Sequence, residues 1–184
     1  MADEAVLRHD VVNLLRGGHA HIGFKKAVAG MPEELRGRKP RGAPYTAWQQ
    51  VEHMRLAQQD ILEYIRTPKH VSPEWPAAYW PQPVPPTKSA WDRSVRAFQA
   101  DLKTLADMAG DPSTDLLSRV PHDPDGPTIL HELLLVADHN AYHLGQLIVL
   151  RRILGAWEDL RRASSGWARL RLAARSQKAS APRR

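Results

Sequence analysis

Apolar residues recur every three or four positions in four stretches of the chain, and no stretch alternates convincingly with a period of two. Spacing near 3.6 residues is typical of amphipathic helices, so the pattern predicts an all-α protein. The expected helices cover residues 2–29, 46–66, 89–109 and 128–156. Gly17 and Gly18 lie inside the first of them, where their low helix propensity predicts a kink or a close helix contact.

Local signals mark several helix ends. Thr46 and Gln49 form a T-x-x-Q capping box, in which each side chain accepts a hydrogen bond from a backbone N–H that the helix leaves unpaired. Ser89 is the expected N-cap of the third helix, and Gly110 is its expected C-terminal stop. The second helix should end before Pro68, because the residue preceding a proline disfavours helical geometry.

A long segment separates the second and third helices. It reads "TPKHVSPEWPAAYWPQPVPPTKSA", with seven prolines that exclude a regular helix. It also carries Trp75, Tyr79 and Trp80, which we expect to pack over the helices as an ordered loop. The sequence therefore predicts a four-helix bundle with a long connection between helices 2 and 3.

The net charge of +6 over 184 residues has one source. Residues 158–184 hold eight basic and two acidic side chains, whereas residues 1–157 hold equal numbers of each. We expect residues 1–157 to form one domain and residues 158–184 to be a basic extension, partly helical or disordered. Nucleic-acid binding through this extension is the less favoured interpretation, because the segment is short and lacks a recognised DNA-binding pattern.

Composition and terminal pattern exclude several classes. The chain has no cysteine, which rules out disulfides, cysteine metal ligands and a cysteine nucleophile of its own. The beginning of the chain lacks the basic start and unbroken apolar run of a secretory signal. The longest mostly apolar run, "LGQLIVL", is too short to cross a bilayer. These features predict a cytoplasmic protein with no membrane partner.

The stretch "DHNAYHLGQ" carries the candidate chemistry. On a helix, His139 and His143 lie one turn apart and about 40° apart in rotation, so both imidazoles can reach one metal ion. The alternative is that both are core residues, and this alternative also applies to His53 on the inward side of the second helix. The protease motif H-E-x-x-H is excluded because Asn140 stands where that motif has glutamate.

Several polar residues are candidates to orient such a site. A metal-bound histidine usually donates its second N–H to a carboxylate or a carbonyl. The candidates are Asp60, Glu132, Asp138 and Gln146, each of which is otherwise expected to be an ordinary solvated or helix-pairing residue. For Tyr142 the two interpretations are that it lines the pocket of the site or that it packs in the interior, and we expect packing. We expect His131 to lie at the surface or its boundary.

Two long segments, "WQQVEHMRLAQQDILEYI" and "LLLVADHNAYHLGQLIVLRRILGAW", resemble the DinB-like (YfiT-related) superfamily of metal-binding four-helix-bundle proteins. The resemblance extends over nearly all of residues 1–157. It implies that His53, His139 and His143 bind a divalent metal ion, typically zinc or nickel, and that the chain forms a homodimer. Three histidines leave coordination positions open, as in catalytic zinc sites.

The resemblance also implies a range of functions. One is a divalent-metal-dependent enzyme, either a transferase or isomerase that uses a low-molecular-weight thiol such as bacillithiol or mycothiol, or a hydrolase. The alternative is a non-catalytic, stress-related metal-binding protein. The sequence identifies neither a catalytic residue nor a substrate, so enzymatic activity remains open at this point.

Overall fold

The computed structural model describes residues 2–157, which are helical throughout apart from their connections. The elements are α1 (Ala2–Arg16), α2 (Phe24–Val28), α3 (Glu33–Arg36), α4 (Ala47–Arg66), η1 (Ala77–Tyr79), α5 (Lys88–Gly110) and α6 (Ile129–Ile153). This part of the chain contains no β-strand, and its only β-type pairing is one bridge between Arg119 and Thr128. The predicted all-α class is confirmed. No helix between residues 2 and 157 has the length and apolar character to cross a membrane.

The prediction of one continuous helix over residues 2–29 is wrong. α1 ends at Arg16, and the chain turns at Gly17 and Gly18 before α2 begins at Phe24. The φ angles of the two glycines are 64° and 91°, in the left-handed region that glycine adopts without a steric cost. The glycines therefore end the helix instead of kinking it.

The helix starts match the sequence signals in part. The capping box is confirmed, because Thr46 Oγ1 accepts from Gln49 N and Gln49 Oε1 accepts from Thr46 N, each at 3.1 Å. The expected N-cap Ser89 is wrong: Thr87 caps α5 by accepting from Ala90 N at 3.2 Å, and Ser89 lies in the first turn. Both threonine and serine hydroxyls suit an N-cap, so their types did not separate the two positions.

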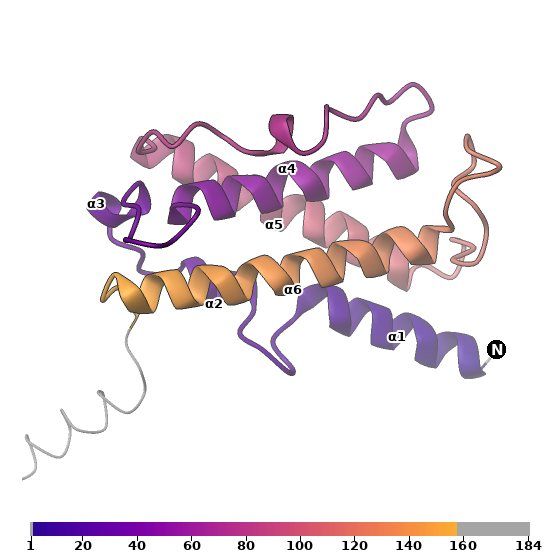
Figure 1. Cartoon of the computed structure of the whole chain (residues 1–184). Coiled ribbons are helices and arrows are strands. Elements are labelled where there is room, and N and C mark those ends of the chain that lie inside the picture. Colours follow the sequence, from indigo (N-terminus) through magenta and orange to yellow (C-terminus); the bar gives the residue numbers. More distant parts are fainter. Residues whose placement is uncertain (1, 158–184) are drawn as a thin grey trace, which may run out of the picture.

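The four long helices pack side by side, with α4 against both α5 and α6, and α1 against α5 and α6 (Figure 1). Their apolar faces form two clusters. The first joins α2 to the beginning of α4 and α5 and the end of α6, and includes Phe24, Met54, Phe98 and Leu147. The second joins α1 to the end of α4 and α5 and the beginning of α6, and includes Val11, Leu62, Leu105 and Leu133. Helices α4 and α5 are thus parallel, and α6 runs against them.

Parallel neighbours explain the segment between α4 and α5. The 20 residues of α4 span about 30 Å, and the chain must return over this length before α5 can start beside it. Residues 67–87, here called the crossing segment, do so along the outside of α4, with η1 near the middle (Figure 1). Tyr79 is buried and Trp80 is partly buried, as expected, but Trp75 is 64% exposed. The expectation that Trp75 packs inward is wrong, since its ring contacts Tyr79 from outside.

A band of buried polar side chains lies where α4 and α6 face each other, and hydrogen bonds connect the two helices there. The band consists of Gln50, His53, Gln58, Asn140 and His143. Buried polar groups are costly unless they are hydrogen-bonded. Burial of these polar groups in the interior therefore calls for a reason other than apolar packing. The three histidines of the candidate site lie in or beside this band.

Candidate metal centre

Three histidines from two helices meet in the polar band. His53 comes from α4, and His139 and His143 come from α6. One ring nitrogen of each lies within 4.8 Å of the other two. The Nε2 atoms of His53 and His139 are 3.1 Å apart. Two nitrogens bound tetrahedrally to one zinc ion at its usual bond length are about 3.3 Å apart, so small side-chain movements would bring the cluster to ligand spacing.

The ring of His53 is held from two sides. Its Nδ1–H donates to the carbonyl oxygen of Tyr79 at 3.0 Å, which leaves the Nε2 lone pair facing the other histidines. One face of the ring stacks on Trp80, with centroids 3.8 Å apart and planes within 4° of parallel. Trp80 in turn stacks on Tyr45 at 3.6 Å. The crossing segment thus sets both the tautomer and the orientation of this imidazole.

A pair of glutamines orients His143. The Nδ1–H of His143 donates to Gln50 Oε1 at 2.8 Å. The amide nitrogen of Gln50 donates to Gln146 Oε1, also at 2.8 Å, so the Gln50 oxygen is the atom that faces the histidine. His143 Nε2 is then the nitrogen that carries a lone pair. Histidines that bind a metal usually donate their second ring N–H to a neighbouring acceptor in this way, which fixes the tautomer and the orientation of the ring.

Burial keeps the three imidazoles neutral. It lowers the pKa of His139 to about 4, and the neighbouring His53 adds to the effect. Burial likewise lowers the pKa of His143 to about 3, with further contributions from His139 and His53. For His53, burial lowers the pKa more than the hydrogen bond to Tyr79 raises it. Neutral imidazoles at pH 7 have the lone pairs that metal binding requires.

The donor set fits a divalent transition metal. Three neutral nitrogens suit zinc, nickel, copper or iron(II), and geometry and supply decide among them. With three protein ligands, positions for water or a substrate atom stay open, as in catalytic zinc sites.

Asp60 does not contact the three histidines directly; it is linked to His53 through Tyr79. Its carboxylate accepts from Tyr79 Oη at 2.7 Å and lies 2.6 Å from His70 Nε2. Tyr79 is the residue whose carbonyl holds His53. Asp60 therefore positions the crossing segment.

The remaining polar candidates differ in their surroundings. Gln146 is linked to His143 through Gln50, and its own side chain also acts on His143, raising the pKa of that imidazole against the larger effect of burial. Glu132 is buried, and burial raises the pKa of its carboxyl group. Asp138 is exposed, and in the described part of the chain no hydrogen bond joins either acid to the three histidines.

Tyr142 and His131 are both exposed residues of α6. Tyr142 is 65% exposed, with its ring edge-on to His143 at 4.9 Å, so the expectation that it packs in the interior is wrong. His131 is exposed, as expected.

Sequence reasoning missed Gln50 and the contacts of the crossing segment. Gln50 precedes His53 by three residues and therefore lies on the same face of α4, which is a signal that the spacing offered. The Tyr79 carbonyl and the Trp80 ring gave no such signal. Both reach His53 from 26 or more residues away, through the path of the loop.

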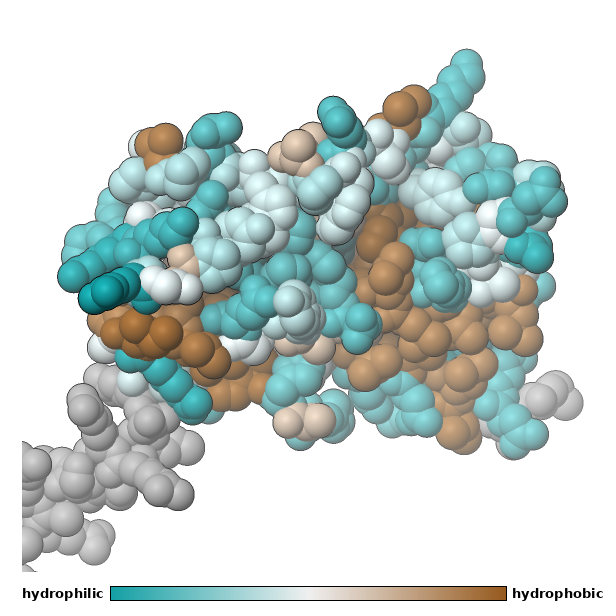
Figure 2. Space-filling model, in the orientation of Figure 1, coloured by the Kyte–Doolittle hydropathy of each residue, from teal (hydrophilic) through white to brown (hydrophobic). Residues whose placement is uncertain are grey.

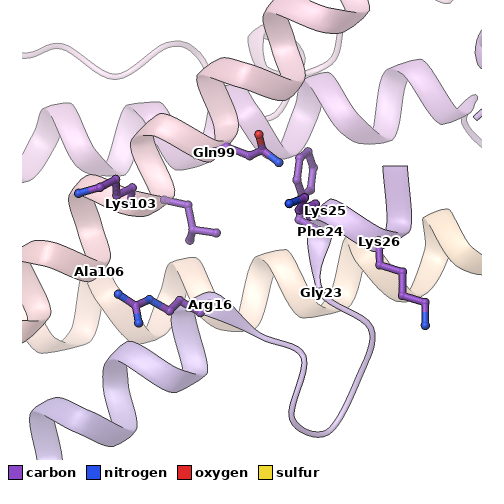
Figure 3. Close-up of a pocket in the computed structure, with 9 residues that line it drawn as sticks. Arg16, Gly23, Phe24, Lys25, Lys26, Gln99, Lys103 and Ala106 are labelled. Atoms are coloured by element: carbon purple, nitrogen blue, oxygen red, sulfur yellow. The ribbon is translucent and has the colours of Figure 1, made fainter. Parts of the chain in front are cut away.

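A separate hollow of about 360 Å³ lies between the end of α1, α2 and α5 (Figure 3). Its apolar floor includes Phe24 and Ala106, and its rim carries four cationic side chains: Arg16, Lys25, Lys26 and Lys103. None of the three histidines lines it. The hollow is therefore not part of the candidate metal centre.

The fold and the cluster define a helical protein with three converging neutral imidazoles. The model of the DinB superfamily matches residues 23–147, about two thirds of the chain and a range that includes all three histidines. The chain belongs to the DinB superfamily, which confirms the resemblance. Comparisons with curated proteins and with solved structures gave no match.

Proposed function

We propose that this protein is a divalent-metal-dependent enzyme whose metal ion, zinc or nickel, is held by His53, His139 and His143. The observation that carries the proposal is the convergence of their ring nitrogens within 4.8 Å. Its support is the fixed Nδ1 donation of His53 and His143, which turns both Nε2 atoms toward the cluster. In this interpretation the helices form the DinB/YfiT-like four-helix bundle, in which α4 and α6 carry the ligands.

The reaction class we propose is group transfer, isomerisation or hydrolysis, with a low-molecular-weight thiol or water as nucleophile. A bound divalent ion with open positions supplies Lewis acidity and lowers the pKa of a water or thiol ligand. Because the chain has no cysteine, a thiol nucleophile must come from a small molecule. The chain's own contribution is to orient: Gln50 and the Tyr79 carbonyl hold two imidazoles, and the Tyr45–Trp80 stack covers one face of His53.

The alternative function is a non-catalytic metal-binding protein. It is supported by the hydrogen bonds that tie the polar band together beside the cluster. Asn140 Nδ2 donates to Gln58 Oε1 at 2.9 Å, and Gln58 Nε2 donates to the Phe98 carbonyl at 2.8 Å. These bonds join α6, α4 and α5. An ion that binds only the folded arrangement of these helices would stabilise it further, which is a structural role that needs no catalysis. The homodimer implied by the family remains a prediction, which sedimentation equilibrium of the full chain tests.

Turnover measurements separate the two functions. Zinc- and nickel-loaded protein is screened with small thiols and with water against a panel of electrophiles, beside His143→Ala and the surface control His131→Ala. The enzyme proposal predicts turnover that chelation and His143→Ala abolish and that His131→Ala retains. Turnover that survives His143→Ala contradicts it. A stoichiometric ion that raises the melting temperature, with no turnover for any pair, favours the non-catalytic alternative.

A further inference from the structure

A groove of about 650 Å³ adjoins the three-histidine cluster. It runs between the loop of residues 41–45 and the second half of α6. Gln50 and Tyr142 line it, and these two residues also contact His143, one by a hydrogen bond and the other through its ring. The groove and the candidate metal centre thus share a wall. The volume lies in the range of sites for small organic ligands.

The groove is apolar, with one charge. Val149 and Ile153 line it and are 54% and 62% exposed, and apolar surface gathers over this C-terminal end of α6, at the left of Figure 2. Exposed apolar side chains lose the stabilisation that burial would give them. A contiguous apolar patch on the surface is therefore typical of a ligand-binding or protein-binding site. Arg41 is the single charged residue of the lining, and within residues 2–157 it makes no hydrogen bond or ion pair. The groove therefore offers apolar contact together with an unpaired cation.

A helical glycine, Gly145, lines the groove. Gly145 lies inside α6, where glycine is less favourable than alanine. A Cβ atom built at this position would meet nothing within 4 Å, so the chain's own packing does not require glycine here. The absent side chain instead leaves space in the wall of the groove.

We propose that this groove binds a small organic anion with an apolar body, such as a medium-chain or aromatic carboxylate. Arg41 pairs with the anionic group, the apolar body lies over Gly145 against Val149 and Ile153, and the Gln50–Tyr142 end places the molecule beside the three histidines. Gly145 is then a specificity-determining residue. Binding of the anion in the groove does not depend on the proposed function. Its role as the substrate of the metal centre does rest on that function.

Octanoate tests the groove by calorimetric titration of the full chain in both its zinc-loaded and its chelator-treated form, with octanol and acetate as probes that lack the charge or the apolar chain. We expect Gly145→Leu to weaken octanoate binding at least tenfold and Arg41→Gln to weaken it about fivefold, as for the loss of one partly exposed charged contact. Ala100→Leu, an exposed position of α5, and Arg38→Gln, in the same connection as Arg41, are the matched controls and should stay within about twofold. Val149→Gln gives a second groove variant. Equal octanoate affinity in Gly145→Leu and Ala100→Leu overturns the proposal.

Two further results fix the location and the occupant. In cobalt-loaded protein, the NMR signals of bound octanoate should broaden relative to the zinc-loaded form, because the groove adjoins the cluster. If the protein binds no metal, the proposed function fails while the calorimetric result for the groove stands. If octanoate binds only after residues 158–184 are removed, or if Gly145→Leu dissociates a dimer without changing octanoate affinity, the chain itself or a second copy occupies the groove and the proposal is wrong.

Discussion

Gln50 controls the candidate centre without being one of its ligands. It accepts the Nδ1–H of His143 and is itself fixed by Gln146. Mutation of a residue that hydrogen-bonds to a metal ligand typically weakens metal binding by a factor of 10 to 100. We therefore expect Gln50→Ala to weaken zinc binding by roughly that factor, measured by competition with a chromophoric chelator.

The same helix provides the control for this variant. Gln59 is exposed and accepts from Arg55, away from the cluster, so Gln59→Ala should leave zinc affinity unchanged. Gln50→Glu keeps an acceptor oxygen and should retain most of the affinity. A Gln50→Ala protein that binds zinc as tightly as Gln59→Ala would contradict the role of Gln50.

Buried neutral imidazoles also make the stability of the metal-free protein depend on pH. The pKa values of about 4 for His139 and about 3 for His143 lie below the ordinary value of 6.5. Between these limits the unfolded chain binds more protons than the folded chain, so stability is complete above pH 6.5 and is lost as pH falls. At pH 5 the loss should be on the order of 2 kcal/mol for each histidine.

Urea unfolding of the chelator-treated protein between pH 7.5 and 5 measures this loss. The double variant His139→Gln/His143→Gln lacks both groups and should show a smaller decrease over the same interval. If the variant and the natural sequence lose stability equally, the two histidines do not titrate as described.

At the scale of elements, the crossing segment decides how the centre is built. Apolar spacing and the Thr46 capping box predicted α4 and α6, and hence the helices that carry all three histidines. The contacts of Tyr79 and Trp80 with His53 were not predictable, because they depend on the path of an irregular segment. The break at Gly17 was missed because glycine propensity marks a weak position without saying whether the chain bends or turns there.

The crossing segment also packs tightly against the end of α3. A Cβ atom at Gly37 would lie 2.6 Å from the Cα atom of Pro85, so any side chain there must displace the segment. We expect Gly37→Ala to lower the free energy of unfolding by about 1–3 kcal/mol, the usual cost of overpacking. Gly145→Ala, whose Cβ meets nothing within 4 Å, is the control and should be neutral or stabilising by up to about 1 kcal/mol. Equal stabilities in chemical denaturation would contradict the close packing.

At the scale of the whole molecule, the boundary of the helical body is a prediction from charge and pattern. The extension of residues 158–184 lies outside the described residues. The body is closed at its end by Arg151, which donates to the carbonyls of Ala27 and Ala156 and lies over the ring of Trp157, 4.9 Å from its centroid. These contacts support the prediction that residues 1–157 fold alone.

Removal of residues 158–184 tests this boundary. The shortened chain should keep the metal content and the melting temperature of the full chain. Aggregation or loss of metal would show that the extension belongs to the domain. Salt-dependent DNA affinity present only in the full chain would instead favour nucleic-acid binding through the extension.

The metal content of the purified full chain tests the central claim most directly. Elemental analysis should find close to one divalent ion per chain in the natural sequence and in His131→Ala, and close to none in His143→Ala. An absence of metal from the natural sequence after incubation with zinc or nickel would contradict the account. So would an unchanged metal content in His143→Ala.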